Sequence, residues 1–327
     1  METLIQILAR ELGQKESYIQ NVVTLIDEGN TIPFIARYRK ELHGAMDDTT
    51  LRTLADRLQY LRNLDKRREE VKASIESQGK LTEELSAAID AAATLAEVED
   101  LYLPYKPKRR TRATMAKEKG LEPLADALFA MGPQVDPQAL AADYVNLEKG
   151  VETIEAALQG ASDIIAEAVS DDAGVRKDLR DLYLRRGVLV SRAAEKEPED
   201  TVYRLYYDFR TPVNRVMGHQ VLAINRGERE DILKVGVELD DETARIAVRR
   251  AVVPGRAAME FVRAAADDAW DRLLKPSLER EIRNTLTEQA NEGAIKMFGL
   301  NLKPLLMQPP VKGFVTMGLD PGYRNGC

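Results

Sequence analysis

The stretch DTTLRTLADRLQYLRNLDKRREEVKASIESQGK, residues 48–80, repeats apolar side chains at intervals of three or four residues over most of its length. This spacing places the apolar side chains on one face of an α-helix. Asp48 or Thr49 suits the cap at its start, and Gly79 suits its end. The predicted apolar stripe consists of Leu51, Leu54, Leu58, Leu61, Leu64, Val71 and Ile75. The stretch therefore predicts one long amphipathic helix.

Two shorter helices are predicted directly after this one. Thr82 opens an Ala-rich helix, and Thr94 with Glu97 has the spacing of a capping box for the next. Two helices joined by a short turn are the outline of a helix-turn-helix, but ordinary α-hairpins have the same outline. We expect a candidate helix-turn-helix subdomain at about 49–101, with both interpretations open.

Helical spacing continues through most of the 327 residues, while strand-like patterns are few. The predicted fold class is mostly α: a multi-helix N-terminal region with helix-turn-helix-like hairpins, a small β element near 231–239 and an orphan strand near 313–320. The acidic sequence EKEPED at 195–200 is typical of a surface linker. The expected domains are a helical region at 1–195, a helical central region with the small β element at 201–310, and the start of another domain at 313–327.

The composition excludes several classes of protein and site. Hydrophobic residues make up 44% of the chain and charged residues 31%, and no apolar run approaches the roughly 20 residues that cross a bilayer. The one cysteine is Cys327, and the only histidines are His43 and His219, which excludes an internal disulfide and a Cys/His zinc site. There is no Walker loop, Rossmann fingerprint or nucleophile elbow. We expect a cytoplasmic, non-enzymatic protein without a cofactor or a membrane partner.

A strongly basic segment stands out in this acidic chain, whose formal net charge is −7. The segment YKPKRRTRATMAKEKG, residues 105–120, holds seven basic residues against one acid, Glu118. Pro104 and Pro107 stiffen its backbone, and neighbouring tyrosines offer stacking faces. The candidate phosphate-binding residues are Lys106, Lys108, Arg109, Arg110, Arg112, Lys117 and Lys119. A solvated loop is the alternative interpretation, because most charge runs are solvated.

A second basic cluster lies in IPFIARYRKE, residues 32–41. It adds Arg37, Arg39 and Lys40 to the candidate nucleic-acid-binding residues. Phe34 and Ile35 in the same stretch are equally typical of core residues.

Asp320 is the one carboxylate in a context suggestive of catalysis. It follows the apolar, alternating stretch GFVTMGL and precedes Pro-Gly, which is how RNase H-like folds place their first divalent-metal ligand. A role in supporting the turn is the alternative. One carboxylate is too few ligands for a dedicated metal site, so Asp320 is a remote candidate and we predict no metal site and no catalytic residue in this chain.

Several long segments together resemble the bacterial Tex family of transcription accessory proteins. They are IPFIARYRKE (32–41), EDLYLPYKPKRRTRATMAKEKGLEPLA (99–125), HQVLAINRGERE (219–230), SLEREIRNTLTEQANEGAIKMFG (277–299) and GLDPGYRNGC (318–327). The resemblance implies a helical N-terminal region followed by an RNase H-like (YqgF-type) domain, helix-hairpin-helix modules and an OB-fold RNA-binding domain. By this resemblance, residues 313–327 are the start of a truncated RNase H-like domain.

The expected function is that of a nucleic-acid-associated transcription accessory factor. The chain would serve as its helical scaffold, with an accessory surface that binds the phosphate backbone of RNA or DNA weakly and without sequence preference. The alternative is a protein–protein interaction module that docks RNA polymerase or ribosome-associated partners.

Overall fold

The long amphipathic helix is present in the computed structural model, which describes residues 3–107, 109–195, 201–309 and 312–319. It is α4, Asp48–Glu76. The carboxylate of Asp47 accepts a hydrogen bond of 2.7 Å from the backbone N–H of Thr50, so the cap is one residue earlier than expected. The buried residues of α4 are those of the predicted stripe: Leu51, Leu54, Leu58, Leu61, Leu64, Val71 and Ile75.

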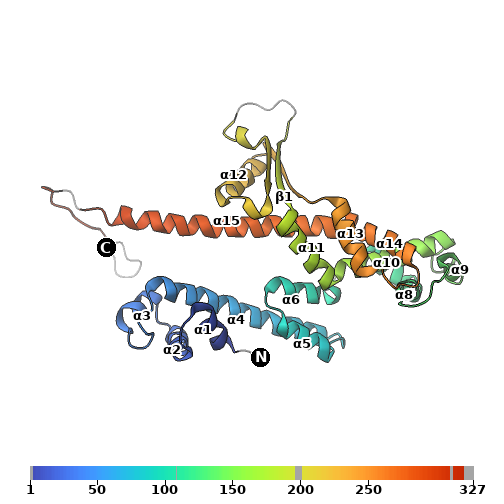
Figure 1. Cartoon of the computed structure of the whole chain (residues 1–327), viewed down its shortest axis with the longest axis horizontal. Coiled ribbons are helices and arrows are strands. Elements are labelled where there is room, and N and C mark those ends of the chain that lie inside the picture. Colours follow the sequence, from blue (N-terminus) through green and yellow to red (C-terminus); the bar gives the residue numbers. More distant parts are fainter. Residues whose placement is uncertain (1–2, 108, 196–200, 310–311, 320–327) are drawn as a thin grey trace. The chain divides into compact units, whose positions relative to one another are not determined.

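The N-terminal half of α4 supports one hydrophobic core. Three helices pack around it (Figure 1), namely α1 (Leu4–Leu12), α2 (Glu16–Asp27) and α3 (Ile32–Tyr38). Leu8, Ile19 and Ile35, one from each helix, are fully buried in the same cluster as Leu51 and Leu54. Each of these helices is too short to be stable alone, so burial against α4 holds them.

The C-terminal half of α4 supports a second core, formed with α5 (Glu83–Ala91) and α6 (Leu95–Tyr102). The predicted caps are confirmed, because the hydroxyls of Thr82 and Thr94 accept hydrogen bonds from backbone N–H groups of the helices that follow them. The predicted capping box is only half formed, since the Glu97 carboxylate accepts from the backbone N–H of Ala93 and not from that of Thr94. One continuous helix therefore organises both parts of the N-terminal region.

Helix α10 (Ile154–Asp171) is the centre of a further group of helices. The helices in contact with it include α7 (Arg112–Glu118), α8 (Glu122–Phe129), α9 (Pro137–Ala142) and α14 (Met259–Asp268). A Cβ at Gly160 of α10 would lie 3.2 Å from the Cβ of Ala116 in α7 and 2.3 Å from a methyl of Leu121. A glycine at this position therefore permits the close approach of α7 to α10.

The chain divides into two compact units, residues 1–177 with 248–269, and residues 178–247 with 270–327. The boundaries fall within α11 (Ala173–Arg186) and α13 (Asp241–Val252) and inside the π-helical turn η4 (Ala269–Leu274). The domain limits expected from the sequence remain predictions.

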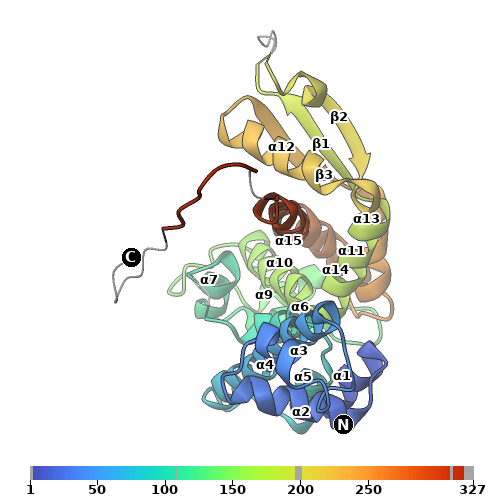
Figure 2. The same cartoon turned by 90° about the vertical axis from the view of Figure 1, so that its left-hand side faces the viewer.

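The second unit contains a three-stranded antiparallel sheet in the order β2-β1-β3. Its strands are β1 (Val188–Ala193), β2 (Asp208–Pro212) and β3 (Leu233–Glu238), and Val188 pairs with Pro212 on one side and Glu238 on the other. Helix α12 (Gly218–Arg229) packs on β3 (Figure 2) and on α15 (Lys275–Leu306). Two 3-10 turns, η2 (Arg204–Tyr206) and η3 (Val213–Arg215), flank β2.

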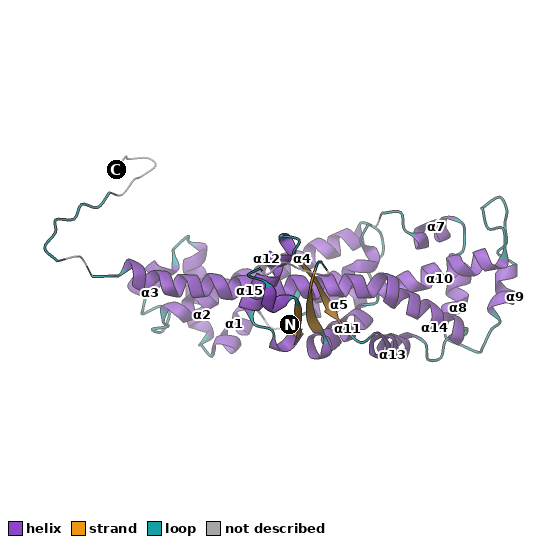
Figure 3. Cartoon of the chain, turned by 90° about the horizontal axis from the view of Figure 1, so that it is seen from above, coloured by secondary structure: helices purple, strands orange, loops and turns teal. Residues whose placement is uncertain are grey.

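The fold is mostly α, with 67% of the described residues helical, as the sequence predicts (Figure 3). The β element expected near 231–239 is confirmed as β3. Strands β1 and β2 were not predicted, so the sheet is larger than expected. The prediction of a strand near 313–320 is wrong for the described residues 312–319, which form no strand. No described strand lies beside them to accept or donate their backbone hydrogen bonds.

Candidate nucleic-acid interface

The basic segment begins from a firm attachment to α4. The Tyr102 hydroxyl lies 3.0 Å from the Ser74 hydroxyl in a hydrogen bond, and the side-chain amide of Gln78 donates to the backbone carbonyl of Tyr105 at 2.9 Å. Pro104 lies between them in the 3-10 turn η1 (Leu103–Tyr105). The backbone that enters the segment is therefore fixed in direction.

The segment ends in α7, which is fixed in turn to the helices around α10. The hydroxyl of Thr111 accepts a hydrogen bond of 3.0 Å from the backbone N–H of Thr114 and caps α7. Ala113 and Ala116 are buried beneath the helix. Because small side chains face inward, the long basic side chains of α7 face solvent.

The described candidates of the segment are all exposed: Lys106, Arg109, Arg110, Arg112, Lys117 and Lys119. Lys108 lies outside the described residues. Two of the exposed side chains are paired, since Arg110 contacts Glu118 at 2.7 Å and Lys117 contacts Glu122 at 2.7 Å. Both pairs are on the surface, where such pairs contribute about 0–1 kcal/mol and exchange readily with a phosphate.

Three basic side chains have no ion-pair partner among the residues that the structure describes, namely Lys106, Arg109 and Arg112. Lys119 adds its positive charge to this surface. Its ammonium group donates to the backbone carbonyl of Gly150 at 2.9 Å, which is not an ion pair. Lys149, an exposed neighbour of Gly150, approaches Gly120 from the other side. Lys149 could not be recognised from the sequence, because only the fold brings the turn after α9 beside the end of α7.

The second basic cluster is held at the end of α3. Ile35 is buried in the first core, whereas Arg37 and Lys40 are exposed and Arg39 is half-buried. The guanidinium of Arg39 lies 5.2 Å from the centre of the Phe34 ring, a cation–π distance. Within the described part of the chain, none of these three basic residues has an acidic partner.

The two clusters are attached at opposite ends of α4. Helix α3 packs with the N-terminal half of α4. At the other end of α4, Ser74 is bonded to Tyr102, and Gln78, just beyond the helix, is bonded to Tyr105 of η1. A helix of 29 residues is about 44 Å long, so the clusters are not one site. A single ligand that contacts both clusters must be extended.

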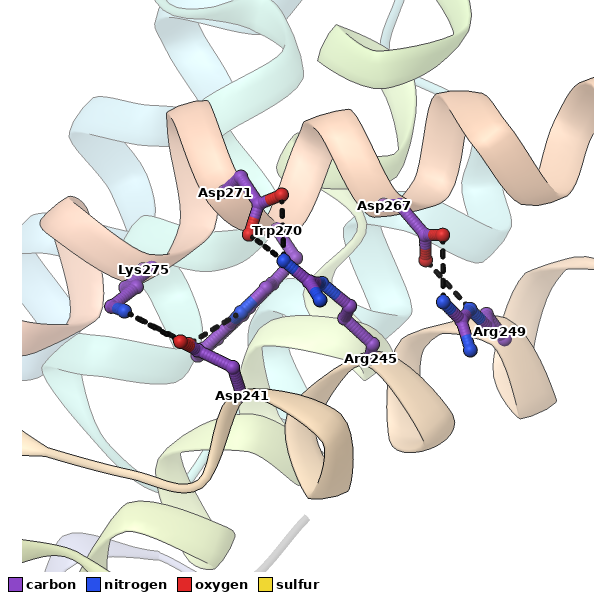
Figure 4. A network of polar contacts seen from close by, with 7 residues as sticks. All are labelled: Asp241, Arg245, Arg249, Asp267, Trp270, Asp271 and Lys275. Carbon is purple, nitrogen blue, oxygen red and sulfur yellow. Dashed lines mark hydrogen bonds and ion pairs between the residues drawn. The ribbon is translucent and has the colours of Figure 1, made fainter.

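The acidic side chains of α13, α14 and the π-turn are engaged in structural contacts (Figure 4). In the first unit, Arg249 binds Asp267 through two bonds of 2.6 and 2.7 Å. In the second, Asp241 accepts hydrogen bonds from Lys275 at 2.8 Å and from the indole N–H of Trp270 at 3.1 Å. The bond from Lys275 holds the pKa of the Asp241 carboxyl below its usual value. Both sets of contacts are structural, and the acids in them are committed to basic partners.

No group of three or more His, Cys, Asp or Glu side chains in the described ranges is arranged to hold a metal ion. Asp320 falls outside those ranges. Among the helices that the structure describes, none combines the length and apolar character needed to cross a membrane.

Comparisons with known proteins identify two family matches. Residues 2–76 match the Tex-like protein N-terminal domain, and residues 132–298 match the Tex central region-like family. The second match alone covers half of the chain, and it includes the sheet and helices α13 and α14, which carry the structural contacts of Figure 4.

Curated relatives match the chain over nearly its full length. The transcriptional accessory protein Tex of Neisseria gonorrhoeae is 43% identical over 333 residues, which is 99% of this chain and 43% of that protein. Protein YdcI of Bacillus subtilis is 45% identical over 335 residues, 100% of this chain and 46% of that protein. The human S1 RNA-binding domain-containing protein 1 is 32% identical over 341 residues, 99% of this chain and 34% of that protein. The chain thus spans less than half the length of these relatives.

Proposed function

The chain belongs to the Tex family, and from that premise we propose that it is a non-enzymatic accessory scaffold in transcription that contacts the phosphate backbone of nucleic acid. The observation that carries the proposal is the basic segment, fixed at both ends, with Lys106, Arg109 and Arg112 exposed and unpaired among the described residues. The name of the gonococcal relative, a transcriptional accessory protein, supports the cellular process.

The chemistry of the segment suits the phosphate groups of a nucleic acid. A guanidinium offers two parallel N–H donors that match two phosphate oxygens, and the fixed backbone lowers the entropy lost on binding. The net charge of −7 does not prevent this contact, because charges beyond about 8–10 Å are screened at physiological salt. Binding through phosphates alone is weak, salt-dependent and indifferent to base sequence.

The test is to change Arg109, Arg110 and Arg112 to Ala and to titrate fluorescent single-stranded RNA, single-stranded DNA and duplex DNA at several salt concentrations. The affinity should fall about equally for different base sequences, and the slope of log K against log salt should become shallower by about 0.7–0.9 for each lost contact. A matched control changes three exposed arginines with acidic partners elsewhere: Arg52, Arg192 and Arg263.

Equal binding by the parent and the basic-segment variant would leave the segment as a solvated loop. The second cluster is tested separately with Arg37→Ala, Arg39→Ala and Lys40→Ala. If one polyanion contacts both ends of α4, this variant should weaken the binding of long oligonucleotides and leave that of short ones unchanged.

A further inference from the structure

A pocket in the second unit lies apart in sequence from the basic segment. It has a volume of about 540 Å³ and is formed by the turn η2 and the exposed side of α12. Its lining residues are Val202, Tyr203, Tyr206, Leu222, Ala223, Arg226 and Arg229. The volume is within the range of pockets that hold a side chain or small ligand.

The turn that forms one wall is rigid although its side chains face solvent. The hydroxyl of Ser191 on β1 donates to the backbone carbonyl of Tyr206 at 2.9 Å, and the rings of Tyr206 and Phe209 meet edge to face at 5.4 Å. A second bond of 2.7 Å joins the hydroxyls of Thr201 and Tyr207. The sheet therefore holds the turn in place.

This rigid turn exposes two aliphatic side chains almost completely. Val202 is 86% exposed and Leu205 is 83% exposed. Aliphatic side chains on a firmly held turn beside a pocket are typical of protein interaction surfaces rather than of solvated loops.

The opposite wall is positively charged. Arg226 and Arg229 are exposed, and neither has an acidic partner in the ranges that the structure describes. On α12, Glu228 is engaged with Arg283 at 2.5 Å, whereas Glu230, the residue after the helix, lies beside Tyr203 in the pocket wall. Two guanidinium groups without an ion-pair partner among the described residues thus stand at the rim, with one carboxylate, Glu230, close to them.

Gly227 brings α12 close to Tyr203, one of the residues that line the pocket. A Cβ at this position would lie 3.1 Å from the ring of Tyr203 and 2.6 Å from a methyl of Leu233. The absence of a side chain allows α12 to lie against Tyr203 and leaves the arginines on either side of the contact.

We propose that this pocket docks a protein segment in which a bulky apolar side chain is flanked by Asp or Glu residues. The apolar side chain enters between Tyr206 and Leu222, its neighbours cover Val202 and Leu205, and the flanking carboxylates pair with the arginines. Single-stranded nucleic acid fits less well, because the Tyr203 ring is buried, the Tyr206 ring already contacts Phe209, and aliphatic side chains offer bases no stacking face.

The experiment is a selection from a random peptide display library on the immobilised full chain. Peptides that are enriched should carry acidic residues beside one Leu, Ile, Phe or Trp. A chosen peptide should bind Arg226→Glu/Arg229→Glu and Val202→Ser/Leu205→Ser at least about tenfold more weakly than the parent. Added salt should weaken the binding of the peptide to the parent and to the serine variant, because both keep the two arginines. It should not weaken the binding of the peptide to the glutamate variant.

Matched controls come from the same unit. Arg185→Glu/Arg186→Glu makes the same charge change in the last turn of α11, and Met217→Ser removes an exposed apolar side chain at the other end of α12. Both should bind the peptide within about twofold of the parent. Circular dichroism checks that each variant is folded.

The proposal is overturned if no peptide is enriched, if the enriched peptides are basic, or if the controls weaken binding as much as the pocket variants. A single-stranded oligonucleotide that displaces the peptide, and whose own binding is lost in both pocket variants, would show that the pocket is a nucleic-acid site instead. Since no residue of the basic segment is changed, the result is independent of the phosphate-binding proposal.

Discussion

Asp100 of α6 and Arg176 of α11 form a buried ion pair, with 2.8 Å between the carboxylate Oδ1 and the guanidinium Nε. Their side chains are only 6% and 8% exposed. Removing one partner of such a pair leaves a buried charge without compensation. We expect Arg176→Met to lower the free energy of unfolding by about 3–5 kcal/mol, measured by urea denaturation.

The adjacent residue gives the control. Lys177 contacts Glu97 at 3.0 Å, but its side chain is 57% exposed. Lys177→Met should therefore cost about 1 kcal/mol or less. The double variant Asp100→Leu/Arg176→Met should recover most of the lost stability, because it removes both charges. If Arg176→Met and Lys177→Met lower the free energy of unfolding equally, burial of the Asp100–Arg176 pair does not make it more important for stability than the exposed pair.

Gly187, between α11 and β1, is the next test. A Cβ at this position would lie 2.5 Å from the carbonyl oxygen of Tyr183, a backbone atom that already accepts the hydrogen bond from the Gly187 N–H. Gly187→Ala should destabilise the second unit by about 1–3 kcal/mol, because the backbone must shift. Thermal unfolding followed by circular dichroism measures this.

Gly236, in β3, is the matched control. Nothing lies within 4 Å of a Cβ built there, and its φ angle is not in the left-handed region. Gly236→Ala should leave the stability unchanged or raise it slightly, since alanine lowers the entropy of the unfolded chain. If both variants unfold at the same temperature, close approach is not the reason for glycine at 187.

The helices could be predicted from the sequence because their signals are local. The stripe from Leu51 to Ile75 has the helical period, and Thr82 and Thr94 cap their helices within three residues. Strand β1 gives no such signal, because its run Val188–Ala193 is short and its partners are β2 and β3, which begin about 20 and 45 residues later in the chain. Pairing over such separations depends on the whole fold.

The candidate interface could be predicted only in part. Charge density identifies the basic segment, but it does not show that Glu118 and Glu122 pair with Arg110 and Lys117. Nor does charge density show that Lys149 lies near Gly120, at the end of α7. The two ion pairs join residues 8 and 5 positions apart and depend on the course of the chain around α7, whereas Lys149 and Gly120 are brought together by a tertiary contact over about 30 residues.

Asp241 makes the stability of the second unit dependent on pH in the acid range. Hydrogen bonds from Lys275 and Trp270 keep the pKa of Asp241 below its unfolded value, even though burial raises it. A lowered pKa in the folded state contributes stability that is present above the unfolded pKa of about 4 and is lost as the pH falls through the folded value. Asp241→Asn should therefore show a shallower loss of stability below about pH 4 than the parent.

The measurement is urea denaturation at closely spaced pH values between 2 and 7. Asp208→Asn is the control, because this exposed carboxylate on β2 has no ion-pair partner among the described residues. It should leave the pH profile of the parent unchanged. If the stability of Asp241→Asn falls with pH in parallel with that of the parent, the bond to Lys275 does not contribute to the pH dependence of stability in the acid range.

Asp320 gives the last prediction, which rests on the sequence because the residue lies outside the described ranges. A dedicated magnesium or manganese site needs several oxygen ligands, and one carboxylate supplies too few. We expect no saturable binding of either ion below about 1 mM in calorimetric titrations, and the same result for Asp320→Asn. Nuclease assays with either ion should show no activity that the substitution removes. Tight binding or strand cleavage that is present in the repurified parent and lost in Asp320→Asn would establish that the chain carries an active site and is an enzyme.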